Sequence, residues 1–377
     1  MLCAGLLSLL RFRLSDALDH AILAASDFLG PFLVLRPEPP QDSFQVGEVG
    51  WSTFRHRHGA FHATHTVPAE QDGKMAASKD GVKRCPARRV TPIMSTHGDK
   101  SDKTIISRTS EIDGVKLHYL TAGQGETLIL LHGYAETSLM WRPIMPLLAE
   151  RFAVIAPDLP GIGDSAIPAD GLDMKTAAIR IHSLARSLAV AKTRVVGHDI
   201  GLMVAYAYAA QFPAEVEKLV LMDAFLPGVD GWEAVYNNPG IWHFRFNGPT
   251  PEALVQERER IYFEHFWNDF AADKTRSIPE ADRKIYAAAY ARPGRMRAGW
   301  AYFVSFQQAA QDFAQLSQTK LMMPVLAIGG EKANGELLGR QMRLVASDVT
   351  VVVLKDTGHW VLEERPEETT DVLVKFL

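Results

Sequence analysis

The pattern of apolar and polar positions changes at about residue 104, where short apolar runs begin to alternate with longer stretches of helical period. Apolar runs of about four to eight residues, rich in β-branched side chains, are typical of buried strands. We expect eight strands, at residues 104–109, 115–121, 127–131, 152–156, 194–196, 218–223, 325–328 and 350–354. Strands that alternate with helices predict an α/β fold, with a mostly parallel central sheet covered by helices on both faces.

Helical periodicity fills several of the intervals, and we expect helices at residues 141–150, 174–188, 202–211 and 368–377. Between residues 224 and 319 the strand signal disappears, and helical stretches replace it at residues 250–266, 280–291 and 297–313. An all-helical insertion between two strands predicts a lid over the carboxyl edge of the sheet, where such sheets bind ligands. The predicted organisation is a core over residues 103–224 and 320–377, with the lid over residues 225–319.

The first 102 residues hold no sustained period of either kind, and Pro, Arg, His and Ser are scattered through them. This composition predicts a disordered extension without a packed core. Four histidines cluster there, and clustered imidazoles can hold zinc or copper. They are His56, His58, His62 and His65. No cysteine or carboxylate lies among them, so we expect neither a metal nor a cofactor.

The composition is that of an ordinary globular protein, 47% hydrophobic and 22% charged over 377 residues. A net charge of -4 supplies no basic field for nucleic acid, so a neutral small molecule is the expected partner. The apolar run at residues 2–10 is closed by Arg11 and Arg13, and it is shorter than the roughly 20 residues that span a membrane. The two cysteines, Cys3 and Cys85, support no disulfide framework. We therefore expect a cytoplasmic protein without stable membrane insertion.

The most informative motif is Gly-His-Asp-Ile-Gly at residues 197–201, directly after the apolar strand at residues 194–196. Its spacing describes a sharp strand-to-helix turn, in which a Cβ at either glycine would collide with a neighbouring strand or helix. Such a turn lifts its central side chain, here Asp199, into open space. A carboxylate in this place can displace a leaving group from saturated carbon and become an ester. Epoxides and carbon–halogen bonds are the corresponding electrophiles.

An ester on Asp199 must be cleaved by water, and a histidine suits that step because its ordinary pKa lies near neutrality. His359 follows the last expected strand, so we predict that it activates this water. An acid must orient the imidazole, and two residues qualify. Asp223 ends one predicted strand, and Glu331 follows another. We favour Asp223, because Glu331 is longer and precedes a loop of small and polar residues that need not be rigid.

Backbone N–H groups must stabilise the oxyanion that forms when water attacks the ester. The run His-Gly-Tyr-Ala at residues 132–135, immediately after a predicted strand, offers Tyr134 as one donor. Ile200, the residue after the nucleophile, offers the other.

Together these motifs resemble those of the epoxide hydrolase and dehalogenase branch of the α/β-hydrolase superfamily. The resemblance covers residues 103–377, in the runs at 132–135, 158–165 and 197–201, with Trp242-His243-Phe244 and Gly358-His359-Trp360. It implies an α/β-hydrolase fold with a helical lid. It also implies a hydrolase that opens a hydrophobic epoxide to a diol with water.

In this family, lid side chains hydrogen-bond the epoxide oxygen, commonly two tyrosines or a histidine and a tyrosine. By resemblance, His243 takes the place of the histidine. The tyrosine, which usually precedes an arginine, falls on Phe303, and Val304 follows it. Tyr302 is adjacent but about 100° around a helix, so it can serve as the second donor only if the helix is rotated or shifted. The expected walls of the substrate pocket are Trp242, Phe244 and Phe303.

Two other interpretations use the same fold. A dehalogenase would share the nucleophile, but haloalkane dehalogenases usually carry tryptophan where this chain has Ile200. Haloacetate dehalogenases resemble Asp-Arg-Gly-Gly-Arg at this point, where Ile200 and Met203 replace the arginines, and an apolar wall is costly for an unpaired anion. The third interpretation is a ligand-binding protein that keeps the fold without activity, and the missing lid tyrosine is the argument for it.

Overall fold

The computed structural model describes residues 104–377; the predicted extension, with its histidine cluster and both cysteines, lies outside this range. Eight strands form one sheet in the order β1-β2-β4-β3-β5-β6-β7-β8. They are β1 (Ile106–Ile112), β2 (Val115–Ala122), β3 (Glu126–Leu131), β4 (Phe152–Pro157), β5 (Thr193–His198), β6 (Val216–Met222), β7 (Val325–Gly330) and β8 (Val349–Leu354). β2 runs antiparallel to both β1 and β4, and the other pairings are parallel. The predicted α/β fold with a mostly parallel sheet is confirmed, and each predicted strand is present with slightly shifted ends.

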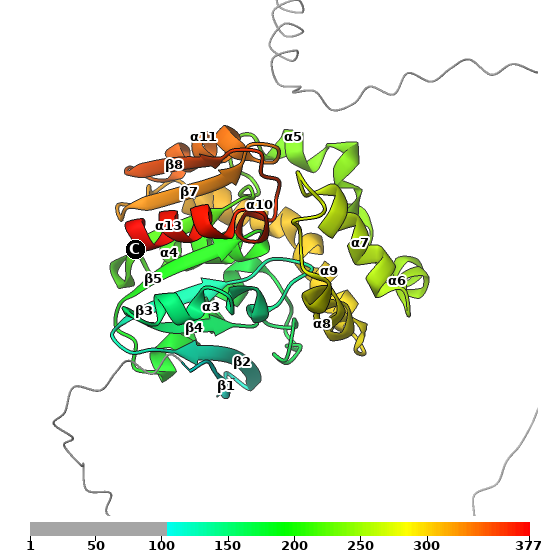
Figure 1. The fold of residues 1–377 in the computed structure, drawn as a ribbon, viewed down its shortest axis with the longest axis horizontal. Helices are drawn as coiled ribbons and strands as arrows, with labels where there is room; N and C mark the ends of the chain where they lie inside the picture. The colour runs from blue at the N-terminus through cyan, green and yellow to red at the C-terminus, as the bar shows by residue number, and fades with distance from the viewer. Residues whose placement is uncertain (1–103) are drawn as a thin grey trace, which may run out of the picture. The chain divides into compact units, whose positions relative to one another are not determined.

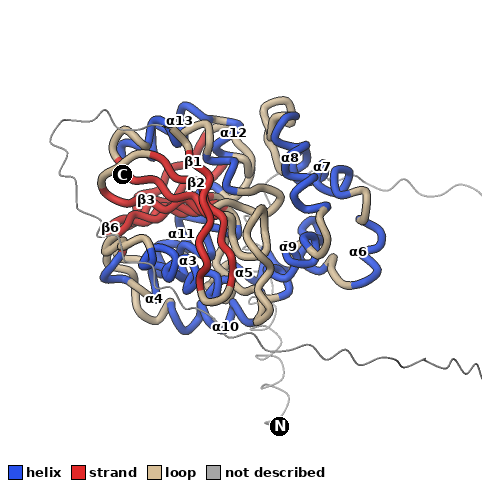
Figure 2. Tube along the Cα trace, turned by 90° about the horizontal axis from the view of Figure 1, so that it is seen from below, coloured by secondary structure: helices blue, strands red, loops and turns tan. Residues whose placement is uncertain are grey.

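Helices cover both faces of the sheet, which is why its central strands are apolar on both sides (Figure 1, Figure 2). One face carries α3 (Met174–Ser187), α4 (Ile200–Gln211), α10 (Phe306–Leu316) and α11 (Gly335–Val345). The other carries η1 (Ser138–Trp141), α2 (Met145–Leu148), α12 (Val361–Glu364) and α13 (Pro366–Phe376). No helix within residues 104–377 is long and apolar enough to cross a membrane.

Between β6 and β7 the chain is helical and contains no strand, as expected from the sequence. This segment begins with α5 (Trp232–Tyr236), η3 (Pro239–Arg245), α6 (Pro249–Val255), α7 (Glu259–Asp269), α8 (Glu280–Ala291) and α9 (Arg295–Val304). Helices α6 to α9 lie together beyond one end of the sheet (Figure 1, right). They meet the loops that follow the strands: the Trp267 indole donates to the Ala135 carbonyl at 3.2 Å, and the Trp360 indole donates to the Phe266 carbonyl at 3.0 Å. The helical segment therefore stands over the carboxyl edge of the sheet.

Some predicted helices are shorter or divided. The helix expected at residues 141–150 is reduced to η1 and α2, because Pro143 and Pro146 each lack a backbone donor. The stretch at residues 250–266 is divided into α6 and α7, and the stretch at residues 297–313 is divided between α9 and α10. Helix α11 has no counterpart in the prediction. Its glycines lower helix propensity, yet Gly339 is required, because a Cβ there would lie 2.6 Å from Val351 of β8.

Candidate active site

The turn after β5 holds Asp199 in a backbone conformation that is rare for an L-residue, with φ 52° and ψ -123°. A Cβ on Gly197 would lie 2.2 Å from the Gly201 carbonyl oxygen, and a Cβ on Gly201 would lie 2.5 Å from the His132 carbonyl oxygen. These distances confirm the predicted tight turn, in which neither glycine can be replaced without a shift of the backbone. Asp199 is partly exposed, whereas its neighbours on both sides are buried. The turn therefore exposes the carboxylate of Asp199, while the residues before and after it in the sequence are buried.

Tyr134 lies on the loop after β3 and borders this carboxylate. Its backbone N–H donates to Asp199 Oδ2 at 2.8 Å. Ile200, the second predicted donor, begins α4 directly after Asp199. The loop is held by His132, whose Nδ1 lies 2.8 Å from the Gly133 carbonyl and whose Nε2 accepts from Leu159 N–H at 2.9 Å. The Tyr134 donor is thus fixed in place before any ligand binds.

His359, on the loop between β8 and α12, pairs with Asp223, the first residue after β6. The distance from His359 Nδ1 to Asp223 Oδ2 is 2.9 Å. Asp223 is fully buried, and its other carboxylate oxygen accepts from Gly330 N–H at 2.9 Å. Glu331 is exposed and pairs with Lys332 at 3.2 Å. Of the two candidate acids, the structure brings Asp223 into contact with the imidazole and leaves Glu331 in solvent.

Asp223 also controls the protonation of this histidine. Burial disfavours the charged ring, but the hydrogen bond and charge of Asp223, followed by the charge of Asp199, outweigh burial and raise the pKa of His359 to about 9. His359 is therefore an imidazolium at neutral pH while Asp199 carries its charge. Neutralisation of Asp199 removes one of these contributions and lowers the pKa of His359.

His243 of η3 and Phe303 of α9 lie side by side near Tyr134, which contacts the turn at residues 197–201, called the elbow below. Their ring centroids are 5.3 Å apart, and Phe303 is 4.6 Å from the ring of Tyr134. His243 is buried, and its Nδ1 has no hydrogen-bond partner within residues 104–377. Burial, followed by the charges of His265 and His359, lowers the pKa of His243 to about 3. His243 is therefore a neutral imidazole with one N–H donor, next to a phenyl ring that has none.

The remaining predicted lid residues are placed differently. Tyr302 is buried, and its hydroxyl donates to the Pro160 carbonyl at 2.9 Å, because one residue along α9 corresponds to a turn of about 100° away from Phe303. The Tyr302 hydroxyl therefore does not face the group formed by His243 and Phe303. Phe244 packs on Phe303 with centroids 5.4 Å apart. Trp242 is 38% exposed and packs against Phe246, with ring centroids 5.1 Å apart.

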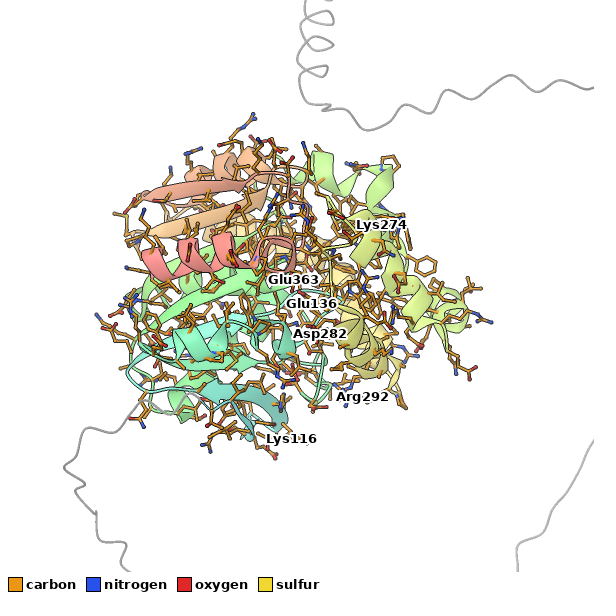
Figure 3. All side chains as sticks on the ribbon, viewed as in Figure 1. Lys116, Glu136, Lys274, Asp282, Arg292 and Glu363 are labelled. Carbon is orange, nitrogen blue, oxygen red and sulfur yellow. The ribbon has the colours of Figure 1, made fainter. Side chains whose placement is uncertain are left out.

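Buried polar residues that the sequence-based prediction missed lie behind His359. Glu136 and His198 are 0% and 1% exposed, and Glu363 follows on α12; Figure 3 labels Glu136 and Glu363. Glu364 accepts from Gly358 N–H at 3.0 Å and from Ala272 N–H at 2.9 Å, which ties the histidine loop to the segment after α7. Glu136 directly follows the run at residues 132–135, His198 lies within the run at residues 197–201, and the other two glutamates lie just after His359. These positions are the one signal in the sequence that could have indicated the four residues.

Within residues 104–377, His118, Asp158 and Asp164 form a group with the spacing of metal ligands. His118 Nδ1 already lies 2.7 Å from Asp158 Oδ2, and His118 Nε2 lies 2.9 Å from the Ser107 hydroxyl. Asp158 also accepts from Ser138 N–H at 2.8 Å. His118 and Asp158 are therefore best described as a buried hydrogen-bonded pair that holds the loop after β4.

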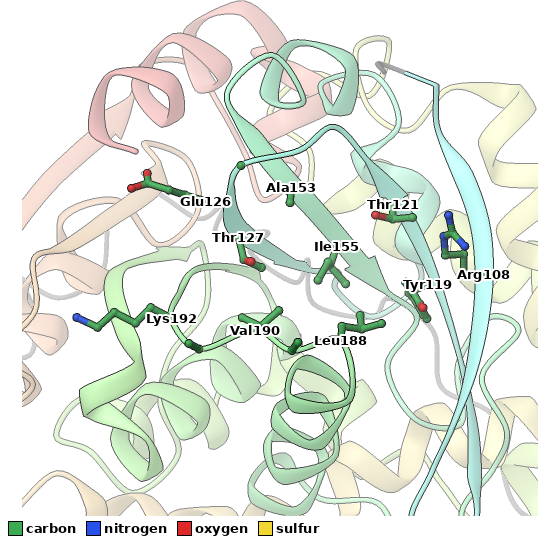
Figure 4. A pocket seen from close by; sticks show the side chains of 13 residues that line it. Arg108, Tyr119, Thr121, Glu126, Thr127, Ala153, Ile155, Leu188, Val190 and Lys192 are labelled. Atoms are coloured by element: carbon green, nitrogen blue, oxygen red, sulfur yellow. The ribbon is translucent and has the colours of Figure 1, made fainter. Parts of the chain in front are cut away.

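A groove of about 580 Å³ lies at the opposite, amino edge of the sheet, where β3 and β5 begin (Figure 4). The residues that line it include Arg108, Tyr119, Glu126, Ile155, Leu188 and Lys192. None of the candidate catalytic or lid residues contributes to this groove. It is separate from the site at Asp199.

The comparisons with known proteins agree with this geometry. A family profile described as the alpha/beta hydrolase fold matches residues 126–366. A soluble epoxide hydrolase from Corynebacterium sp. (strain C12) is 34% identical over 274 residues, which cover 70% of this chain and 94% of that protein. The structure of the epoxide hydrolase CorEH without ligand is 32% identical, with a TM-score of 0.67 over 72% of this chain and 98% of that one. The Cif epoxide hydrolase from Acinetobacter nosocomialis is 28% identical, with a TM-score of 0.67 over 72% and 89%. This chain therefore belongs to the α/β-hydrolase superfamily, in its epoxide hydrolase branch.

Proposed function

We propose that this chain hydrolyses a hydrophobic epoxide to a diol, with an ester on Asp199 as the intermediate and His359 as the group that activates water. The observation that carries the proposal is the carboxylate at the elbow, 2.8 Å from the Tyr134 N–H, on the same edge of the sheet as the His359–Asp223 pair. The relatives named as epoxide hydrolases support the substrate class.

In the first step, an Asp199 oxygen attacks an epoxide carbon while the carbon–oxygen bond of the ring breaks. The bonding pair goes to the epoxide oxygen, which becomes an alkoxide. His243 hydrogen-bonds this oxygen, because its neutral ring offers an N–H in an apolar site. The proton that His359 holds at rest neutralises the alkoxide, and the imidazole becomes a base.

In the second step, the ester has removed the negative charge of Asp199, so the pKa of His359 is lower than in the resting enzyme. The neutral imidazole takes a proton from water, and hydroxide adds to the ester carbonyl. The N–H groups of Tyr134 and Ile200 stabilise the oxyanion. Its collapse expels the alkyl oxygen, which takes the proton of the new carboxylic acid. The cycle ends with a diol, an ionised Asp199 and a protonated His359.

The surroundings of the elbow favour a neutral, hydrophobic substrate. Phe244, Phe303 and His243 present rings and no charge at neutral pH, and Ile200 and Met203 are buried and apolar. A haloacetate would bring a carboxylate into these surroundings, where the protonated His359 is already paired with Asp223, and a buried charge without its own partner costs several kcal/mol. An epoxide is therefore favoured over the anionic dehalogenase substrates.

Incubation of the full chain with styrene oxide and, separately, with chloroacetate tests the proposal. We expect phenylethanediol from the first and no halide from the second. Halide release without diol would assign the protein to the dehalogenases. A folded sample that forms neither product, with a panel of aryl and alkyl epoxides, would favour the ligand-binding interpretation.

We expect Asp223→Asn to lower the pKa of His359 from about 9 toward its ordinary value, because the anionic partner is lost. Epoxide turnover should fall by about 10²-fold or more, since general acid–base catalysis depends on the orientation of the ring. Histidine NMR titration and a diol assay measure the two effects. Glu331→Gln is the matched control and should change neither. A larger loss in Glu331→Gln than in Asp223→Asn would assign the acid to Glu331.

We expect His359→Gln to accumulate a covalent adduct, because Asp199 keeps its charge and solvent can protonate the alkoxide, while ester hydrolysis slows by about 10³-fold. Mass spectrometry of the peptide that contains Asp199 should show the mass of the added epoxide. Asp199→Asn is the control and should remain unmodified. An adduct on another residue, or none during measurable turnover, would contradict the two-step scheme.

We expect Phe303→Tyr to raise epoxide turnover by about tenfold, because a hydroxyl beside His243 would add a second donor to the developing alkoxide. Phe306→Tyr adds the same hydroxyl one helical turn away, where the ring packs on Trp232 and Phe244, and it should not raise turnover. Steady-state rates of diol formation compare the two. Equal effects of both changes, or a loss in Phe303→Tyr with an intact fold, would show that no donor is missing at this position.

A further inference from the structure

Two buried polar side chains, Glu136 and His198, are hydrogen-bonded in series to the main-chain carbonyl of His359. Glu136 Oε2 lies 3.2 Å from His198 Nδ1, and His198 Nε2 lies 3.0 Å from the His359 carbonyl oxygen. Glu136 and His198 are 0% and 1% exposed. The His359 N–H donates to the Phe270 carbonyl at 2.8 Å. The backbone of His359 is therefore hydrogen-bonded at both its N–H and its carbonyl.

The direction of each hydrogen bond follows from which atoms can donate. A backbone carbonyl only accepts, so His198 Nε2 carries the proton that points at His359. In a neutral imidazole the other nitrogen then has a lone pair and no proton. Glu136 must therefore be the donor to Nδ1, which requires a neutral carboxylic acid. The alternative is an ion pair between an imidazolium and a carboxylate.

Burial decides between these two arrangements in favour of the neutral one. Burial, followed by the charge of His359, lowers the pKa of His198. Burial also raises the pKa of Glu136 to about 8, and its effect exceeds the opposing charge of His359. At neutral pH, Glu136 keeps its proton and His198 stays uncharged.

A second carboxyl, that of the half-buried Glu363, lies beside the first. Burial, and then the charge of Glu136, raise the pKa of Glu363 well above its usual range. Oε1 of Glu136 and Oε2 of Glu363 are both buried, and each carboxyl perturbs the pKa of the other through its charge or a hydrogen bond between them. The titratable groups that act on this pair are His198 and Asp199 at the elbow, His359 on its loop, and Tyr286 and Tyr290 of α8. Two carboxyls in such a site cannot both be charged.

The packing leaves no spare room around these contacts. A Cβ on Gly133 would lie 3.1 Å from both Glu136 Oε2 and His198 Nδ1, and 2.9 Å from Asp199 Cβ. The glycine before Tyr134 therefore allows the loop of the oxyanion donor and the Glu136–His198 contact to occupy adjacent space. A displacement of Glu136 would be transmitted to both.

We infer that Glu136 is a positioning residue for His359: as a neutral carboxylic acid it donates to His198, and His198 donates to the His359 carbonyl. The inference rests on the role proposed for His359 as the base. The imidazole gains and loses a proton in each cycle, and its pairing with Asp223 weakens when it is neutral. A main-chain anchor made of uncharged groups holds the ring in place in both states.

Histidine side-chain NMR of the ¹⁵N-labelled full chain tests the proton positions without any substrate. His198, identified by the loss of its signals in His198→Gln, should carry its proton on Nε2 at neutral pH. As the pH rises through about 8, Glu136 ionises and the His198 Nδ1 signal should shift. In Glu136→Gln the amide still donates and cannot ionise, so this shift should be absent. A proton on Nδ1 of neutral His198, or an identical pH response in Glu136→Gln, overturns the inference.

Turnover of the epoxide provides the functional test. Glu136→Gln should stay within about twofold of the wild type at neutral pH, and Glu136→Leu, of similar volume but without a donor, should lose about tenfold in the ester-hydrolysis step. Rescue by Gln and not by Leu supports positioning through the hydrogen bond, and equal rates in all three proteins contradict it. If the wild type opens no epoxide, the proposed function fails, while the His198 tautomer still supports or contradicts the anchor. If Glu136→Leu does not fold, the position of the proton on His198, measured by NMR, still supports or contradicts the inference.

Discussion

The whole site depends on the contact between the β5–α4 turn and the end of β3. Asp199 can occupy a left-handed backbone conformation only because Gly197 and Gly201 let the turn close against the main chain of α4 and β3. That closure brings the Tyr134 N–H to 2.8 Å from the Asp199 carboxylate. Strain at one residue is thus compensated by the packing around β3 and β5, in the middle of the sheet. A carboxylate in a flexible loop would lack this fixed donor.

The second constraint is the scarcity of charge around this carboxylate. His243, Phe244 and Phe303 pack together beside Tyr134, whose N–H contacts this carboxylate, and burial keeps His243 neutral. In such surroundings the few charges that are present act strongly on one another. This is why the pKa of His359 responds to both Asp223 and Asp199. The chemistry that we propose uses this coupling. Esterification removes the charge of Asp199 and lowers the pKa of His359, so the imidazole is neutral and can take a proton from water.

The strands and the elbow could be predicted because their signals are local. Apolar runs rich in β-branched residues mark a strand wherever the tertiary structure buries them, and the spacing of Gly197 and Gly201 specifies the turn by sterics alone. The preference for Asp223 over Glu331 also came from local features, the position at a strand end and the shorter side chain. The structure places Asp223 against His359 and leaves Glu331 in solvent.

The parts that could not be predicted depend on contacts distant in the sequence. Helical periodicity indicates that Tyr302 points away from Phe303, but it cannot identify the Pro160 carbonyl as the partner of the Tyr302 hydroxyl. Helix α11 contains Gly335 and Gly339, which lower helix propensity, and the close approach of β8 explains Gly339. Glu136 would be expected at the surface on composition alone. Its buried, protonated state follows only from the neighbours that the fold supplies.

The central claim is that an oxygen of Asp199 attacks the substrate carbon, and a single turnover in H₂¹⁸O tests it most directly. With enzyme in excess over a styrene-type epoxide, the account predicts an unlabelled diol and one ¹⁸O in the peptide that contains Asp199, because the product takes its new oxygen from the carboxylate and water restores it. A labelled diol together with an unlabelled Asp199 would mean that water attacks the substrate directly, and would contradict the account.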